Sequence, residues 1–123
     1  MVWQVVFGDE FDREFGDLPE AVQDELLAAA KILAVFGPKL GRPHADALKG
    51  SAFSNMKELR FEADGGVWRV AFAFDPKREA ILLVAGDKSG GGEKRFYKSL
   101  IAKADKRFKA HLDRLNAAEK GKT

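Results

Sequence analysis

The sequence contains no cysteine, which excludes disulfide bonds and metal sites built from thiolates. Only two histidines are present, and the sequence shows no cluster of residues that could bind a metal ion. We therefore expect neither a metal nor another cofactor. No apolar run approaches the roughly 20 residues that a membrane-spanning helix needs. The amino-terminal residues, MVWQVVFGDEF, lack the basic leader and apolar stretch of a signal peptide. The sequence therefore predicts a soluble, cytoplasmic protein without membrane contact.

Charge is distributed unevenly along the chain, although the net charge is only +2. Residues 1–36 carry a net charge of −6, residues 37–87 a charge of +1, and residues 88–123 a charge of +7. An acidic first part and a basic last part are typical of a protein with one side that faces a polyanion. A solvated, lysine-rich helix would give the same distribution, so the charge alone leaves both interpretations open.

Hydrophobic spacing predicts a strand and two helices in the first 36 residues. Residues 2–7 are short and rich in β-forming side chains, and Asp9 is placed to cap a short helix over residues 9–18. Apolar residues then recur every three or four positions from 19 to 36, with Pro19 in the first turn and Gly37-Pro38 at the end. Residues 39–55 are polar and glycine-rich, which predicts an irregular loop.

Three strands and a last helix are expected in the second half. The strands cover residues 56–62, 67–74 and 80–85, with a hairpin turn at 64–66 and another turn at 75–78. The helix is expected over residues 93–116, followed by a frayed tail over 117–123. The order β-α-α-β-β-β-α predicts one α+β domain over residues 1–123. Its small curved antiparallel sheet would carry the two amino-terminal helices and the carboxy-terminal helix on one face and leave the other face partly open.

Two arginines are candidates for a functional site on that open face. Arg60 and Arg69 lie on strands joined by a tight hairpin, and strand alternation directs both away from the apolar face. Such a pair on an uncovered sheet surface is unusual unless it meets an anion. An ordinary cross-strand ion pair between Arg69 and Glu58 or Glu62 would also explain the charges.

Four short motifs, in order and at the right spacing, resemble the RelE/HigB/ParE toxin superfamily. They are GRPHADALKG, MKELRF, VWRVAFAFD and AILLVAGDKS, and a basic helix follows them. The pattern is most similar to the phage-like HigB branch and covers residues 2–112. The resemblance implies the toxin component of a type II toxin–antitoxin module, with the curved RelE-like sheet. It also implies a cognate antitoxin as partner, a helix-turn-helix DNA-binding protein.

Three functions are compatible with this resemblance. The RelE and HigB branches imply an mRNA interferase, an endoribonuclease of the hydrolase class that cuts mRNA at the ribosome without a metal and so inhibits translation. The ParE branch implies a non-enzymatic toxin that binds DNA gyrase. A degenerate member would bind only its antitoxin. The chain continues into a long helix after the last strand, where some relatives carry a terminal Tyr or His, so the three hypotheses stay open.

The resemblance also implies site residues, with Arg69 as a phosphate clamp because its fork suits bidentate contact. Lys57 has the opposite strand parity to Arg60, and Tyr97 also falls on the apolar stripe of the last helix, which favours core packing for it. Glu58 is expected to orient the cations or to pair with them, and His44 has a structural interpretation as well as a weaker one as a base. The implied catalytic residues are Arg69, Arg60, Lys57 and Lys88, and the implied RNA-binding residues are Lys94, Arg95, Lys98 and Tyr97.

Overall fold

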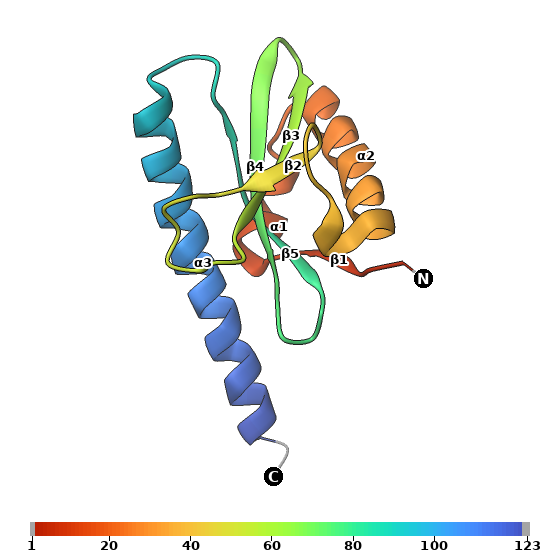
Figure 1. The fold of residues 1–123 in the computed structure, drawn as a ribbon, viewed down its shortest axis with the longest axis vertical. Coiled ribbons are helices and arrows are strands. Elements are labelled where there is room, and N and C mark those ends of the chain that lie inside the picture. Colours follow the sequence, from red (N-terminus) through yellow and green to blue (C-terminus); the bar gives the residue numbers. More distant parts are fainter. Residues whose placement is uncertain (1, 122–123) are drawn as a thin grey trace.

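The computed structural model describes residues 2–121 as a five-stranded sheet with helices on both faces (Figure 1). The strand order is β1-β5-β4-β3-β2, in which β1 runs parallel to β5 and all other neighbours are antiparallel. This confirms the predicted α+β class and the order of the predicted elements. The elements are β1 (Val5–Phe7), α1 (Asp9–Phe15), α2 (Glu20–Phe36), the 3-10 turn η1 (Gly37–Lys39), β2 (Ala45–Ala47), β3 (Lys57–Ala63), β4 (Gly66–Phe74), β5 (Ala80–Asp87) and α3 (Glu93–Lys120).

Several local features differ from the sequence-based expectations. The loop over 39–55 contains β2, which pairs with β3, although its Ala-Asp-Ala sequence has no β-branched residue to signal a strand. Gly8 occupies the N-cap of α1 without a side-chain bond, so the prediction that Asp9 caps this helix is wrong. Helix α1 ends at Phe15, and α3 continues to Lys120. Residues 122 and 123 of the expected tail lie outside the described residues.

The β3–β4 hairpin has the tight turn that its sequence predicts. Asp64 and Gly65 both have positive φ, 51° and 74°, as a two-residue type I′ turn requires. Glycine adopts this conformation without steric cost, and aspartate tolerates it better than most residues. The turn fixes the register of the two strands, and that register places Arg60 directly opposite Arg69.

One hydrophobic core lies between the sheet and the first two helices. Phe11 of α1 and Leu26 and Leu33 of α2 pack against Val70 and Phe72 of β4, and all five side chains are almost completely buried. Leu26 and Leu33 are seven residues apart, so they lie on the same side of the helix. The predicted apolar faces of α2 and β4 are therefore confirmed.

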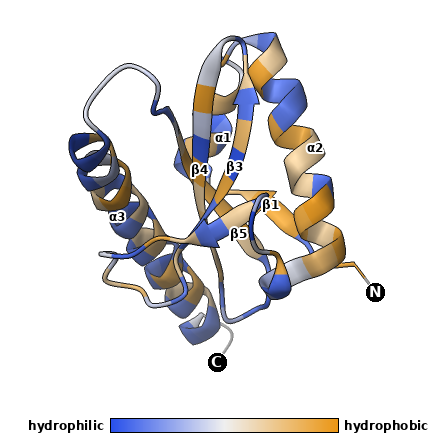
Figure 2. Ribbon diagram, turned by 45° about the horizontal axis from the view of Figure 1, so that its top comes forward, coloured by the Kyte–Doolittle hydropathy of each residue, from blue (hydrophilic) through white to orange (hydrophobic). Residues whose placement is uncertain are grey.

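A second core covers the opposite face of the sheet, where Leu100, Ala104 and Phe108 of α3 pack against Ala71 and Ala73. The prediction that this face stays partly open is wrong. The small alanine side chains let the helix approach the sheet. Strand β5 is apolar on both faces, with Ala80 and Leu82 in the first core and Ile81, Leu83 and Val84 in the second. Figure 1 shows α3 and α2 on opposite sides of the strands. In Figure 2 much of α3 is hydrophilic, because its apolar stripe is narrow.

Candidate nucleic-acid interface

A buried carboxylate links the two arginines of the β3–β4 hairpin. Glu58 lies two residues before Arg60 on the face of β3 that α3 covers, and it is only 3% exposed. One of its oxygens, Oε2, lies 3.1 Å from Arg60 Nη1, and the other, Oε1, lies 3.8 Å from Arg69 Nε. Oε1 is buried without a hydrogen-bond partner. Glu58 is thus the counter-charge for both guanidinium groups, as the sequence suggested.

Tyr97 closes this network from the second turn of α3. Arg69 Nε donates to the Tyr97 hydroxyl at 3.3 Å, and the hydroxyl donates to Glu58 Oε2 at 3.2 Å. Arg69 is held further by a bond from Nη1 to the carbonyl oxygen of Trp68 at 2.9 Å. Burial of the phenol, and next its hydrogen bond to the Glu58 carboxylate, raise the pKa of Tyr97 above its ordinary 10.0. The phenol is therefore protonated at neutral pH.

The two arginines are consequently not equivalent. The side chain of Arg69 is 6% exposed beneath Tyr97, whereas that of Arg60 is 23% exposed. The expected surface with both guanidinium groups uncovered is wrong, because α3 reaches across β4 at this point. Arg60 is the arginine that a ligand can reach, and Arg69 supports Tyr97 and Glu58 from beneath.

A cationic groove of about 510 Å³ lies above this network. It is formed by β2, β3, the segment after β2, and the region where β5 leads into α3. Five of its lining residues are basic and three are acidic, so it carries an excess of positive charge. The lining residues are Arg42, Asp46, Ala47, Leu48, Lys49, Glu58, Arg60, Lys88, Glu93, Lys94 and Tyr97.

Two ion pairs with exposed members neutralise part of the positive charge that lines the groove. Arg42 Nε lies 2.9 Å from Asp46, and Lys88 Nζ lies 2.9 Å from Glu93, while Lys88 also sits 5.9 Å from the centre of the Tyr97 ring. The Arg42 and Glu93 side chains are largely exposed. Exposed pairs of this kind contribute only about 0–1 kcal/mol, so an incoming anion can replace their acidic partners at little cost.

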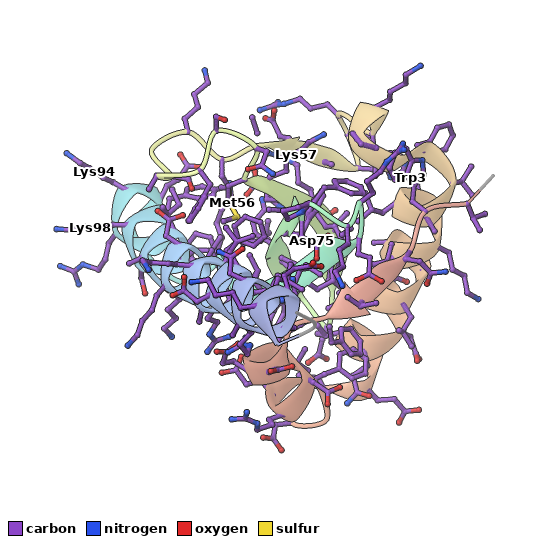
Figure 3. The ribbon with its side chains drawn as sticks, turned by 90° about the horizontal axis from the view of Figure 1, so that it is seen from below. Trp3, Met56, Lys57, Asp75, Lys94 and Lys98 are labelled. Atoms are coloured by element: carbon purple, nitrogen blue, oxygen red, sulfur yellow. The ribbon has the colours of Figure 1, made fainter. Side chains whose placement is uncertain are left out.

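Three other implied site residues lie apart from this network. Lys57 faces the α2 side of the sheet, where its ammonium group donates to the carbonyl oxygens of Leu40 at 2.6 Å and Pro38 at 3.2 Å, and burial lowers its pKa. Arg95 and Lys98 line a separate shallow hollow with Lys94. Figure 3 shows Lys94 and Lys98 projecting outward from α3, with Lys57 on a different part of the molecule. The structure thus brings together Arg60, Lys88, Lys94 and Tyr97, with Arg69 beneath them.

Sequence reasoning missed Arg42, Lys49 and Glu93 as parts of the site. The two basic residues belong to the GRPHADALKG loop, in which the sequence suggested a role only for His44. Their position depends on β2, because the pairing of Asp46 with Glu58 carries this loop alongside β3. His44 belongs to the same loop and lines another hollow with Arg60 and Arg69.

The described part of the chain contains no group of three or more His, Cys, Asp or Glu residues that could hold a metal ion. None of the helices in residues 2–121 is long and apolar enough to cross a membrane.

Comparison with known proteins places the chain in a family. The family described as phage-derived protein Gp49-like matches residues 13–109. Over 103 residues, the chain is also 43% identical to a predicted toxin of Mycobacterium tuberculosis named HigB3, an alignment that covers 84% of this chain and 88% of that protein. The chain belongs to the Gp49-like family of HigB-type toxins. The recognition of a toxin of a toxin–antitoxin module from the four motifs is confirmed.

Further relatives of this HigB-type toxin agree with that assignment. A second predicted toxin of M. tuberculosis, HigB2, is 44% identical over 88 residues, which are 71% of this chain and 43% of that protein. A mutant of the E. coli toxin RelE in its free state superposes with a TM-score of 0.59 at 12% identity, covering 84% of this chain and 97% of RelE. RelE from the Pyrococcus horikoshii RelE–RelB complex gives a TM-score of 0.52 at 19% identity, covering 74% and 100%. These structures show a shared fold.

Proposed function

We propose that this HigB-type toxin is a single-domain mRNA interferase, an endoribonuclease that cuts mRNA at the ribosome without a metal ion. The observation that carries the proposal is the cationic groove. It places Arg60, Lys88 and Lys94 around the Tyr97 phenol, directly above the buried Glu58–Arg69 pair. We further propose that the protein acts in the cytoplasm, where ribosomes supply the substrate.

The first step is binding of the RNA backbone in the groove. Phosphate groups compete with Glu93 and Asp46 for Lys88 and Arg42, and these acidic partners then turn into solvent. Displaced counterions contribute to the binding free energy, so the affinity falls as the salt concentration rises. The exposed Lys94, Arg95 and Lys98 extend the positive surface beyond the groove and contact backbone on either side of the bound phosphate.

The second step is stabilisation of charge at the scissile phosphate. The 2′-hydroxyl loses its proton to solvent, and its oxygen attacks the phosphorus through a phosphorane with additional negative charge. The bond to the 5′-oxygen then breaks and leaves a 2′,3′-cyclic phosphate. The Arg60 guanidinium stabilises this charge through its planar fork. Lys88 and the protonated Tyr97 are the groove's candidate proton donors to the departing 5′-oxygen. Arg69 is a positioning residue, because it acts through Tyr97 and Glu58.

We also propose that a cognate antitoxin, a helix-turn-helix DNA-binding protein, neutralises the toxin. Membership of the HigB-type family supports a protein partner. The shared fold with RelE in a RelE–RelB complex supports it independently, because that toxin was crystallised with its antitoxin.

Inducible expression in a bacterial host tests the role of the groove. The wild-type protein is expected to arrest growth, and Arg60→Ala to relieve the arrest. Arg13→Ala is the matched control, because Arg13 is an exposed arginine on α1, remote from the groove, and this variant is expected to remain toxic. Soluble levels of the three proteins are compared by immunoblot.

Three other outcomes of this expression experiment would contradict the proposal. Full toxicity of Arg60→Ala would remove the groove from the mechanism. Growth arrest with DNA-damage signalling and intact mRNA would indicate a gyrase poison of the ParE type. Soluble wild-type protein without any effect on growth would indicate a member that only binds its antitoxin.

A further inference from the structure

Strand β5 has an open edge along its second half. Its first three residues, Ala80–Leu82, pair with β1 on one side and with β4 on the other. The strand continues to Asp87, but the pairing with β1 ends at Leu82. Within residues 2–121, no strand covers this edge beyond that point. A row of backbone groups without strand partners is a template for another extended chain.

The direction of the backbone groups shows which residues are available. Lys88 N–H donates to the carbonyl oxygen of Val67, at the end of the ladder with β4. By alternation, Ala85 and Asp87 direct their N–H and C=O groups to the open edge. A bulge before Val84 shifts this alternation, so that Leu83 C=O also faces outward, where Arg107 donates to it at 2.8 Å. Ala85 is partly exposed and Asp87 is exposed.

A second groove, of about 360 Å³, lies between this edge and α3 and is here called the edge groove. Its apolar wall contains Phe96 and Leu100 of α3 and Val84 of β5. Gly86 permits this arrangement, because a Cβ atom there would lie 2.8 Å from the Phe96 ring. The edge groove therefore offers backbone hydrogen bonds on one side and a surface for an apolar side chain on the other.

The charged rim of the edge groove is predominantly positive. Lys88, Arg95 and Lys103 line it, and Asp87 is its only acidic lining residue. The Asp87 carboxylate accepts bonds from Val67 N, Ser89 N and Ser89 Oγ, all through Oδ1, and these bonds hold it against the start of β4 and the segment after β5. Arg95 and Lys103 are exposed on α3, where they can pair with acidic side chains of a ligand.

We propose that the edge groove binds an extended, acidic peptide segment of a partner protein as an added strand. The peptide backbone pairs with Ala85 and Asp87, an apolar side chain lies against Phe96 and Leu100, and acidic side chains flank it. Peptide fits better than RNA because the available groups are backbone donors and acceptors at strand spacing beside an apolar wall. The pair Arg107–Glu14 closes the inner end at Leu83, which limits the added strand to a short segment.

This site does not depend on RNA cleavage, and its test uses binding alone. The probe is a fluorescent, acetylated heptapeptide of alternating glutamate and valine with a central leucine, titrated against the full chain and followed by anisotropy. Amide chemical shifts and hydrogen exchange of Ala85 and Asp87 report whether the peptide reaches the edge. The control peptides carry lysine in place of glutamate, or N-methyl groups on the backbone amides that would pair with the edge.

The proposal predicts that the acidic peptide binds and protects the Ala85 and Asp87 amides from exchange. The double variant Arg95→Glu, Lys103→Glu should raise its Kd at least about tenfold, because two attractive pairs become repulsive. Lys106→Glu, an exposed position of α3 outside the groove, should leave the Kd almost unchanged. Both exposed-charge variants preserve the cores, and thermal unfolding verifies their folding.

Four results of the peptide titration would overturn the proposal. They are no binding of the acidic peptide at millimolar concentration, equal affinity for the lysine or N-methylated peptide, unchanged affinity in the double variant, and chemical-shift changes that avoid β5. Light scattering reports self-association of the protein, and an oligouridine titration is followed through the same amide signals. Protection of the edge by self-association, or by RNA instead of the peptide, would also refute the peptide assignment.

Discussion

Among individual residues, Tyr97 has the position with the most chemical consequence. Its hydroxyl lies between a buried guanidinium and a buried carboxylate, so it satisfies part of the hydrogen-bonding needs of both. A buried charge without partners is costly, and the network reduces that cost for Glu58 and Arg69. The same contacts keep Arg69 away from solvent. Access of a ligand to this site therefore depends on Arg60 and on the cations around it.

Tyr97 should ionise only above its ordinary pKa of 10.0. It is the single tyrosine of the chain, so phenolate absorbance reports on it alone. Because its pKa is raised in the folded state, its contribution to stability is complete below pH 10.0 and is lost as the pH rises through the folded value. We expect Tyr97→Phe to show no phenolate transition. A wild-type transition at or below 10.0 would contradict the network.

The candidate site was only partly predictable from these residues. The parity of Glu58, Arg60 and Arg69 follows from strand alternation and the hairpin, both of which the sequence shows. The burial of Arg69 could not be predicted from strand alternation, because it depends on the position of Tyr97, which belongs to a helix distant in the sequence. Lys57 was assigned by motif, but its parity places it on the opposite face, among backbone carbonyls of η1 and the following residue.

Among the helices and strands, α3 has the strongest influence on the cationic groove, because its packing sets which of the groove's side chains are covered. It covers the sheet face that carries the arginines, and ion pairs fix it to α1. Arg107 contacts both carboxylate oxygens of Glu14 at 2.7 Å and also donates to Leu83 C=O. One arginine thereby connects α3, α1 and β5. This connection stabilises the helix position from which Tyr97 reaches Glu58.

Arg107→Ala should lower the free energy of unfolding by about 1 to 2 kcal/mol, measured by urea denaturation at neutral pH. The lower part of that range is expected because Glu14 is half exposed and its pairing is screened. The exposed neighbour Lys106 provides the control substitution Lys106→Ala, which should change stability little.

The pH dependence of this difference is a further part of the same prediction. The Arg107 hydrogen bonds lower the pKa of Glu14 below its ordinary 4.5. A lowered pKa contributes stability above the unfolded value, and that contribution is lost as the pH falls through the folded value. The stability gap between wild type and Arg107→Ala should narrow in acid below 4.5. A gap that stays constant there would argue against the carboxylate as the partner.

Most elements were predictable because their signals are local. The Asp64-Gly65 turn, the apolar spacing of α2 and the doubly apolar β5 each reflect a conformational or burial preference of neighbouring residues. The placement of α3 was not predictable in this way. Ala71 and Ala73 look like a neutral face in isolation, and they become a core only when Leu100 and Phe108 pack on them.

Across the whole molecule, the acidic first part and the basic last part meet each other in the fold. Arg107 pairs with Glu14, and Arg114 lies 3.3 Å from Asp9. Part of the positive charge of α3 is therefore neutralised internally along its second half. The first turns of the helix and the segment before it retain their exposed cations, and the cationic groove lies there. The charge distribution along the sequence indicated a side that faces a polyanion. The fold shows that this side lies at the first turns of α3 and the segment before it.

The most direct test of the account is mapping of mRNA 5′ ends after induction, with and without a translation inhibitor. Wild type and the control Arg13→Ala should create new 5′ ends within coding regions, and the inhibitor should suppress them. Arg60→Ala should reduce the abundance of these ends at least about 100-fold, as expected for loss of a residue that stabilises transition-state charge. Wild-type induction without new ends, or equal cleavage by Arg60→Ala, would contradict a groove-based ribonuclease.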